Sequence, residues 1–361
     1  MEEEMKNEEE LALQIRNLKS CFFTGKGVVT GVDDVSIGVP PGKIIGLVGE
    51  SGCGKSMTAM SVMGLLRHPG KVVGGSILLN GRDITHLSAK ERSKVRGNEI
   101  SMIFQEPMTS LNPVYPVGRQ VQEAILLHQK VSKEEAKKQV IEIFRQVGIP
   151  EPEKRYRSYP HQLSGGLRQR VMIGMAMVCR PKVMIADEPT TALDVTIEAQ
   201  ILRLMKKLRD DFGTSIILIT HNMGVVAEVC DYVYVMYAGK VMEEAETFAL
   251  FENTSHPYTR GLLRSIPRLD QREERLYTIK GVVPNLLHLP QGCSFCTRCP
   301  YAKEECFLKR PELYEAGREH KVRCFLFRER SAEGESGNSA ESAAAGSVLS
   351  ENERSLEGGM A

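Results

Sequence analysis

Residues 49–56, GESGCGKS, constrain the fold more than any other segment of this sequence, because they fit the pattern G-x-x-x-x-G-K-[ST]. They follow the apolar run 43–49, which reads as a buried strand, and precede a helical pattern over 56–66. In such a strand, loop and helix, glycines let backbone N–H groups surround phosphate oxygens at the helix N-terminus. Lys55 is then expected to reach the β- and γ-phosphates and Ser56 to ligate Mg²⁺. The segment predicts a nucleotide-binding α/β domain.

Two further apolar runs, Val183–Asp187 and residues 215–221, read as buried central strands. Because such runs alternate with helical patterns, the chain is expected to form a largely parallel sheet. The first run ends in Asp187 and Glu188, which places two carboxylates at the carboxyl edge of the sheet. We expect Asp187 to act through the metal, and Glu188 to orient or deprotonate an attacking water.

Helical signals fill residues 112–178, which read as a helical insertion in the α/β core. Ser132 and Glu135 form a capping box at the start of one helix, and Gly148 followed by Pro150 ends it. Further on, Ser164 is followed by two glycines before a helical pattern over 168–178. A hydroxyl and bare backbone donors at a helix start favour anion binding.

Charge and composition divide the 361 residues further. Net charge is +1, yet residues 1–10 and 331–361 each carry −5, so the body carries +11. A basic body suits phosphate ligands or an anionic membrane surface, although a mixed solvated surface explains it equally. We expect four parts: an acidic segment (1–10), the nucleotide-binding domain (11–260), a Pro- and Cys-rich extension (261–330) held together by something other than a core, and a disordered acidic tail (331–361).

No apolar stretch approaches the roughly 18 residues needed to cross a bilayer, so any membrane role is expected to be peripheral. The acidic N-terminus is unlike a secretory signal, which would be basic and then apolar. We therefore expect the nine cysteines to lie in a reducing compartment.

Six motifs occur in the order and spacing of ATP-binding-cassette (ABC) ATPases, and over residues 11–260 the chain resembles that family. They are the phosphate loop, FQEP at 104–107, LSGGL at 163–167, VMIADEP at 183–189, TALD at 191–194 and His221. The resemblance implies an α/β fold: an ABC-type P-loop core with an antiparallel β subdomain and a helical subdomain at about 112–178. It also implies ATP hydrolysis between two cassettes that associate head to tail, so a second cassette subunit, identical or homologous, is expected.

The resemblance also assigns roles to single residues. Gln105 matches the glutamine that touches Mg²⁺ and the attacking water, His221 the histidine that contacts the γ-phosphate, and Asp194 the aspartate that communicates across the dimer. Phe22 matches the aromatic that stacks on adenine, with Phe23 as the alternative. The expected catalytic residues are Lys55, Gln105, Glu188 and His221, and the expected Mg²⁺ ligands are Ser56, Gln105 and Asp187. Expected contacts to nucleotide are Phe22, Gly49, Ser51, Gly52, Cys53, Gly54, Lys55, Ser56, Met57, Gln105, Ser164, Gly165, Gly166, Asp187 and Asp194. An exposed Cys53 would have a lowered pKa in the positive field of the loop and would react with thiol reagents.

Residues 104–118, 255–267 and 281–306 resemble the ATP-binding subunits of dipeptide, oligopeptide and nickel importers. This implies two membrane-spanning permease subunits, an indirect link to an extracytoplasmic solute-binding protein, and a place on the cytoplasmic face of the membrane, with no nucleic acid as partner. The alternatives are nickel or another small solute as cargo, a nontransport cassette acting on nucleic acid or ribosomes, and a regulatory subunit that binds ATP without hydrolysing it.

The extension contains five cysteines, and Cys293, Cys299, Cys306 and Cys324 match positions at which some members of this subfamily ligate a 4Fe–4S cluster. Cys296 departs from the pattern and forms a ferredoxin-like run with Cys293 and Cys299, so it is a possible substitute ligand. Zinc on four of the five thiolates, or no metal, remains open.

Overall fold

The computed structural model describes residues 11–105, 110–191, 193–266 and 277–328. The expected acidic N-terminal segment and disordered tail lie outside these residues, as do Glu106 and Pro107 of the FQEP motif. Within the described ranges, no helix is both long and apolar enough to cross a bilayer.

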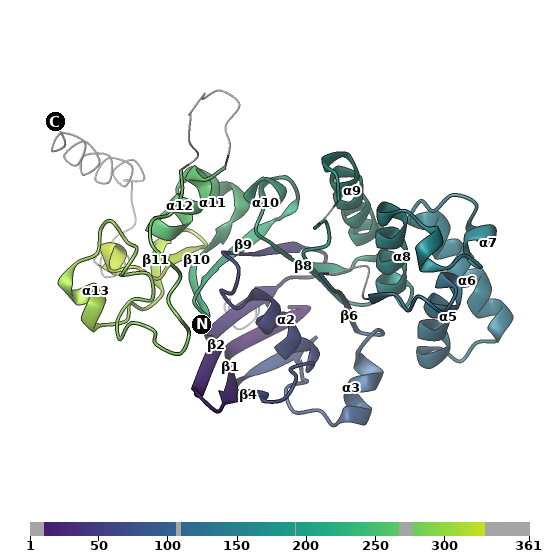
Figure 1. Ribbon diagram of the computed structural model, residues 1–361, viewed down its shortest axis with the longest axis horizontal. Helices are drawn as coiled ribbons and strands as arrows, with labels where there is room; N and C mark the ends of the chain where they lie inside the picture. The colour runs from purple at the N-terminus through teal and green to yellow at the C-terminus, as the bar shows by residue number, and fades with distance from the viewer. Residues whose placement is uncertain (1–10, 106–109, 192, 267–276, 329–361) are drawn as a thin grey trace.

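A parallel sheet forms the centre of the molecule (Figure 1). Its order is β9-β3-β8-β7-β6, in which every neighbouring pair is parallel. The strands are β3 (Ile44–Val48), β6 (Ile100–Ile103), β7 (Val183–Asp187), β8 (Ser215–Thr220) and β9 (Tyr232–Tyr237). The three strands predicted from apolar runs are thus confirmed, with ends within two residues of the prediction.

Three antiparallel strands extend this sheet beyond β9, in the order β10-β12-β11. They are β10 (Lys240–Glu246), β11 (Tyr314–Gly317) and β12 (His320–Val322). Residues near the end of the described chain therefore complete the same sheet that holds the phosphate loop.

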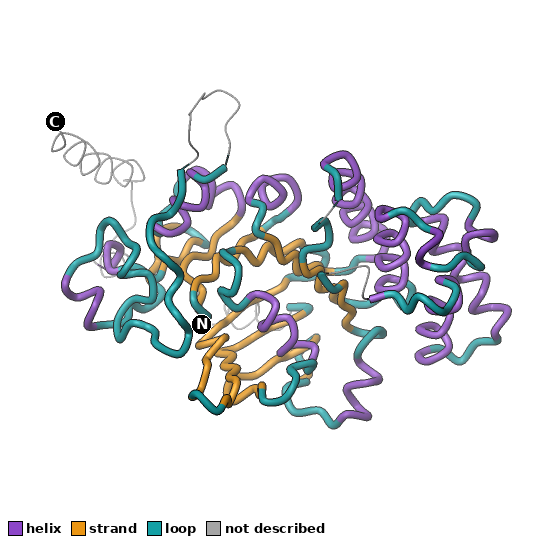
Figure 2. Tube along the Cα trace, in the orientation of Figure 1, coloured by secondary structure: helices purple, strands orange, loops and turns teal. Residues whose placement is uncertain are grey.

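A second, antiparallel sheet has the order β2-β1-β4-β5 and packs on one face of the first (Figure 2). Its strands are β1 (Leu13–Thr24), β2 (Gly27–Val39), β4 (Gly70–Leu79) and β5 (Arg82–Asp83). Helix α2 (Lys55–Met63) contacts β1, β2 and β4 on one side and β7 on the other. The helix that follows the phosphate loop is thereby held between two sheets.

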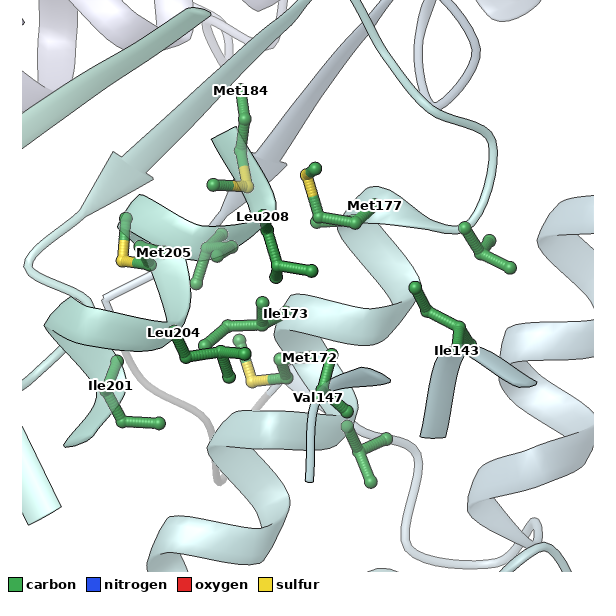
Figure 3. Close-up of a cluster of buried hydrophobic side chains, with 14 of the residues drawn as sticks. Ile143, Val147, Met172, Ile173, Met177, Met184, Ile201, Leu204, Met205 and Leu208 are labelled. Atoms are coloured by element: carbon green, nitrogen blue, oxygen red, sulfur yellow. The ribbon is translucent and has the colours of Figure 1, made fainter. Parts of the chain in front are cut away.

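The central strands are buried on both faces, which is typical of a parallel sheet covered on each side. Alternate residues face opposite ways: Ile45 and Val183 pack toward the antiparallel sheet, whereas Ile44 and Met184 pack toward the helices. Figure 3 shows Met184 with side chains of α8 (Gly165–Met177) and α9 (Val195–Phe212), among them Met172, Ile173, Leu204 and Leu208. Full burial of one such side chain contributes about 1.5–3 kcal/mol, so the two layers fix the sheet firmly.

Helices lie beyond the other face of the sheet, mostly in the region predicted to be helical. They are α5 (Val117–His128), α6 (Lys133–Gln146), α7 (Pro152–Arg155), the short 3₁₀ helix η1 (Pro160–Gln162), α8 (Gly165–Met177) and, further along, α9 (Val195–Phe212). Helix α8 packs on the sheet next to α9, and α5 and α6 pack in turn on α8 (Figure 1). The Ser132 cap is confirmed, because its hydroxyl accepts from the Glu135 N–H at 3.1 Å. The reciprocal half of the predicted capping box, a bond from the Ser132 N–H to the Glu135 side chain, is not formed. Helix α8 begins three residues earlier than predicted, because Ser164 caps it and both following glycines are helical.

Residues 277–328, here called the C-terminal segment, pack against the end of the sheet. Phe295 is buried and contacts Tyr237 and Tyr258, with ring centroids 5.3 and 5.4 Å apart. Because Phe295, Val322 and Phe327 are buried and β12 pairs with β10, the expectation that this segment lacks core packing is wrong. The remaining elements are α3 (Ala89–Val95), α10 (Met223–Val229), α11 (Thr247–Glu252), α12 (Pro257–Arg264), α13 (Glu304–Leu308) and η2 (Phe325–Phe327).

Glu243 on β10 ties three separate pieces of chain together. Its side chain is fully buried and accepts from the backbone N–H groups of Ser255 and His256, at 2.6 and 3.0 Å. The same carboxylate lies 2.8 Å from Nε2 of His320 on β12. A buried carboxylate is stable only when its oxygens are hydrogen-bonded, as they are here.

We predict that Glu243→Ala lowers the free energy of unfolding by roughly 3–5 kcal/mol, because it leaves a buried imidazole and two buried N–H groups without their acceptor. Urea unfolding followed by circular dichroism measures the effect. The matched control is Glu246→Ala on the exposed end of the same strand, which should change stability by less than about 0.5 kcal/mol. Equal effects of the two variants would show that Glu243 has no special role.

Candidate functional site

The phosphate loop runs from the end of β3 to the start of α2 and depends on three glycines. Gly49, Gly52 and Gly54 have φ angles of +146°, +77° and +110°, a region that residues with a Cβ rarely adopt. A Cβ at Gly49 would lie 2.2 Å from the carbonyl oxygen of Met236, and one at Gly54 would lie 2.4 Å from that of Gly31. Glycine is therefore required here both by the backbone conformation and by close approach to β9 and β2.

Hydrogen bonds hold this loop at several points. The Gly239 N–H donates to the carbonyl oxygen of Cys53 at 2.8 Å, and the Glu50 N–H donates to the hydroxyl of Tyr258 at 2.8 Å. Lys55 as a whole is only 6% exposed, and its ammonium donates to the carbonyl oxygens of Gly49 and Glu50, at 2.6 and 3.1 Å. The lysine charge thus lies at the mouth of the loop, where phosphate oxygens would bind.

Cys53 is buried, so the exposure on which its expected reactivity depended is not found. Burial raises the pKa of the Cys53 thiol, and the nearby Lys55 ammonium offsets this only in part. The expectation of a lowered pKa is therefore wrong: desolvation outweighs the positive field of the loop. Cys53 contributes packing beneath the loop, where its Sγ would be 2.8 Å from a Cβ at Gly49.

Asp187, at the end of β7, has the properties of a cation ligand. Its Oδ1 is buried and, among the described residues, has no hydrogen-bond partner. Burial raises the pKa of this carboxyl, whereas a hydrogen bond from Ser56 and the Lys55 charge lower it. An unsatisfied buried carboxylate oxygen beside a hydroxyl fits Mg²⁺, which prefers oxygen ligands.

Glu188 is the meeting point of the expected catalytic residues. Its Oε2 accepts from Gln105 Nε2 and from Thr191 Oγ1, both at 2.9 Å, and its Oε1 lies 3.1 Å from His221 Nδ1. The three partners follow β6, β7 and β8, whose carboxyl ends lie at one edge of the sheet. Glu188 itself has a φ of +46°, a left-handed conformation that costs a residue with a Cβ about 1–2 kcal/mol.

The surroundings of Glu188 keep its carboxylate charged. Burial raises the pKa of Glu188, but hydrogen bonds from His221, Thr191 and Gln105 and the charge of His221 outweigh it, so the pKa lies below its usual value. A carboxylate in this form accepts hydrogen bonds only, which suits it to orient a water molecule.

The other expected residues lie apart from this centre. Ser164 caps α8 and Asp194 caps α9, accepting the N–H groups of Leu167 and Ile197. These two helix starts are neighbours, since a Cβ at Gly166 would lie 3.0 Å from Ile197 Cγ2 and one at Gly165 would lie 3.7 Å from Leu193. Figure 1 shows α8 among the helices, away from α2 and the phosphate loop.

Four residues expected to contact nucleotide lie around the phosphate loop or on the antiparallel sheet. Met57 on α2 lies against β2, where a Cβ at Gly31 would be 2.1 Å from its Sδ. Phe22 on β1 is partly buried against Gly70, whereas Phe23, the alternative stacking residue, is 48% exposed. Ser51 and Gly52, at the crest of the loop, are exposed.

All five cysteines of the C-terminal segment line one cavity of about 140 Å³. Burial raises the pKa of Cys293 and Cys299 to about 11 and that of Cys324 to about 12. In the described part of the chain, however, no group of three or more His, Cys, Asp or Glu side chains is arranged to hold a metal ion. The thiols have the donor chemistry of the expected cluster, but their arrangement is not that of ligands.

Sequence reasoning missed three contacts to the site: those of Thr191, Tyr258 and Arg298. Thr191 and Tyr258 lie within motifs that indicated the family, but nothing in either motif indicated a partner. The Arg298 guanidinium donates to both carboxylate oxygens of Glu50, at 2.6 and 3.1 Å. The two residues are 248 positions apart, so no local pattern could have paired them.

Comparisons with known proteins agree with this geometry. A family profile described as "ABC transporter" matches residues 32–191, and one described as "Oligopeptide/dipeptide transporter, C-terminal region" matches residues 242–306. An ATP-binding cassette solved as a dimer with ADP and phosphate has a TM-score of 0.59 and 25% identity, covering 65% of this chain and 98% of its own. The cassette cbiO1 from Clostridium perfringens has the same TM-score at 27% identity, covering 68% of this chain and 92% of its own.

The protein is an ABC-type ATPase. Oligopeptide transport ATP-binding protein AppD of Bacillus subtilis (strain 168) is 50% identical over 322 residues, covering 89% of this chain and 98% of that protein. The corresponding OppD of Salmonella typhimurium (strain LT2) is 50% identical over 307 residues, covering 85% and 91%. The chain therefore belongs to the family of oligopeptide and dipeptide transport ATP-binding proteins.

We predict that Glu188→Gln retains ATP binding but lowers turnover by about 10²–10⁴-fold, because the amide cannot accept a proton from water. Phosphate release at saturating ATP and nucleotide titration measure the two properties separately. Glu123→Gln, on the exposed surface of α5, is the control and should turn over normally. Unchanged turnover in Glu188→Gln would remove this residue from the role.

Proposed function

We propose that this protein is the ATP-hydrolysing subunit of an importer that takes up di- and oligopeptides. The observation that carries the proposal is the arrangement of Gln105, Thr191 and His221 around Glu188, at the sheet edge that also presents the phosphate loop. An intact site of this kind supports hydrolysis rather than regulatory ATP binding. Peptide as cargo rests on the relatives named above and on the C-terminal region match.

The residues divide the chemistry among them. The loop N–H groups and Lys55 bind the phosphates of ATP, and Glu188 orients the attacking water and accepts its proton. Ser56, Asp187 and Gln105 would hold Mg²⁺, which neutralises charge on the phosphates when bound. Water attacks the γ-phosphorus in line, the bond to the β-phosphate oxygen breaks, and ADP and phosphate leave.

A second cassette subunit is part of the proposal, because one chain offers a single phosphate loop and a single Ser164–Gly166 segment in different parts of the fold. If both contact one ATP, they come from two chains. The dimeric cassette among the similar structures supports this arrangement. ATP binding would close the pair, and release of phosphate would reopen it.

The remaining partners would be two membrane-spanning permeases, with an extracytoplasmic solute-binding protein as an indirect partner. The chain would then act at the cytoplasmic face of the membrane as a peripheral subunit. Nickel or another small solute is the alternative cargo, and a nontransport cassette acting on nucleic acid or ribosomes is the alternative class.

We predict that a tagged chain, expressed at native level and purified from membranes in gentle detergent, brings down two multi-spanning permeases, with or without a second cassette subunit. Mass spectrometry identifies the co-purifying proteins. The Glu188→Gln chain is the matched sample, because slowed turnover should leave the assembly intact. Recovery with ribosomes or nucleic acid and without a permease would favour the nontransport alternative.

The proposal also includes a metal site: the cysteine cavity would hold a 4Fe–4S cluster on Cys293, Cys299, Cys306 and Cys324. Support comes from the gathering of these thiols, together with Cys296, around one cavity. Cluster binding would displace thiol protons that burial retains, and the ligands would have to move into place. Zinc is the alternative metal, and Cys296 the alternative ligand.

We predict that anaerobically purified protein absorbs near 400 nm and contains about four iron and four sulfide per chain, the stoichiometry of a cubane cluster. Cys299→Ser should lose most of this absorbance, whereas Cys179→Ser, which follows the end of α8 and does not line the cavity, should keep it. Stoichiometric zinc without sulfide would show that the cavity binds zinc and not a cluster. The absence of both metals would overturn the proposed metal site.

A further inference from the structure

Arg298 belongs to the C-terminal segment, yet its side chain contacts the phosphate loop directly. Its side chain is 3% exposed and forms a two-pronged ion pair with Glu50, at 2.6 and 3.1 Å. Glu50 is the second residue of the loop, between Gly49 and Ser51. A paired guanidinium and carboxylate of this geometry fixes orientation as well as distance.

The rest of the guanidinium is anchored in its own segment. Nε donates to the carbonyl oxygen of Lys280 at 3.1 Å, and NH2 also donates to that of Ile279 at 3.2 Å. The cation lies 5.8 Å from the ring centre of Tyr237 and 5.9 Å from that of Phe295. NH1 also donates to the Tyr237 hydroxyl at 3.4 Å. Since its partners other than Glu50 are backbone groups, this hydroxyl and buried rings, Arg298 is held in place and transmits its position to Glu50.

Glu50 is held on its backbone as well as on its side chain. Its N–H donates to Tyr258, whose ring packs on Tyr237 with centroids 4.7 Å apart. Its carbonyl oxygen accepts from the Lys55 ammonium at 3.1 Å. A shift of Glu50 would therefore move both the loop backbone and the lysine that faces the phosphates.

We propose that Arg298 is a positioning residue for ATP binding: through its ion pair with Glu50, the C-terminal segment holds the phosphate loop in the shape that receives the phosphates. Arg298 does not touch the reacting atoms and acts through Glu50. The proposal rests on the assignment of ATP binding to this loop. It makes the C-terminal segment part of the nucleotide site, independently of any metal in the cysteine cavity.

The test is a double-mutant cycle with Arg298→Gln, Glu50→Gln and the pair of substitutions together, made in the 361-residue chain. We expect each single variant to weaken binding of a fluorescent ATP analogue, and to raise KM for ATP, by about tenfold, which corresponds to about 1.4 kcal/mol. The double variant should be little weaker than either single variant, because both remove one interaction. Since Glu188 is untouched, kcat at saturating ATP should change by less than about twofold, a split between KM and kcat that general loss of structure would not give.

Two further variants complete the experiment. Arg298→Lys keeps the positive charge but not the two-pronged geometry of the guanidinium, so it should bind ATP more tightly than Arg298→Gln. Arg310→Gln, which removes a more exposed arginine of the same segment that pairs with Asp33 at 3.4 Å, should bind normally.

If Arg298→Gln is misfolded by circular dichroism, Glu50→Gln and Arg298→Lys probe the same contact. Additive effects, or unchanged affinity in Arg298→Gln and Glu50→Gln, would overturn the inference while ATP binding itself stands. An unsubstituted chain that binds no ATP would overturn the proposed function and this inference together.

Discussion

The structure depends on the burial of one short strand, β3, on both of its faces. Ile44 faces the helices, Ile45 and Leu47 face the antiparallel sheet, and parallel neighbours lie on each side. Because packing on both faces fixes β3, the residue that follows it, Gly49, has a fixed position. Helix α2 begins just beyond the loop and lies between the two sheets. The phosphate loop can be rich in glycine and still keep its shape, because its rigidity comes from the layers around it.

The carboxyl edge of the parallel sheet places polar catalytic side chains directly after apolar, buried strands. β6, β7 and β8 are mostly apolar and are followed by polar residues where the sheet ends. The parallel strands therefore bring Gln105, Glu188 and His221 together at one edge. Glu188 adopts a left-handed conformation and loses some hydration, and three hydrogen bonds offset that cost. Strain of this kind persists at a functional site only where the surrounding structure fixes it.

Much of the core could be predicted from the sequence because its signals are local. The apolar runs gave β3, β7 and β8, and the Ser132 cap with Gly148 gave the limits of α6, since a capping hydroxyl and its N–H partner are three residues apart. The convergence of Glu188 with its partners followed from motif order and a family resemblance. What escaped prediction depends on distant contacts. Cys53 is buried in a cluster with Met236, and its carbonyl oxygen accepts from Gly239 in the β9–β10 turn. The pairing of β12 with β10 joins residues far apart in the sequence. Phe295 of the C-terminal segment packs on Tyr237 and Tyr258, which belong to other parts of the chain.

The ion pair between Glu50 and Arg298 also bears on the order in which the protein is made. The phosphate loop leaves the ribosome early, whereas the residue that braces it is synthesised 248 positions later, and β12 later still. Until then the outer edge of β10 has unpaired backbone groups that would pair with another strand. Bringing Glu50 and Arg298 together closes a long loop, which has an entropic cost. The contacts that offset this cost form only when the chain is nearly complete. The phosphate loop of a nascent chain therefore lacks its ion pair with Arg298 until residues of the C-terminal segment have been added.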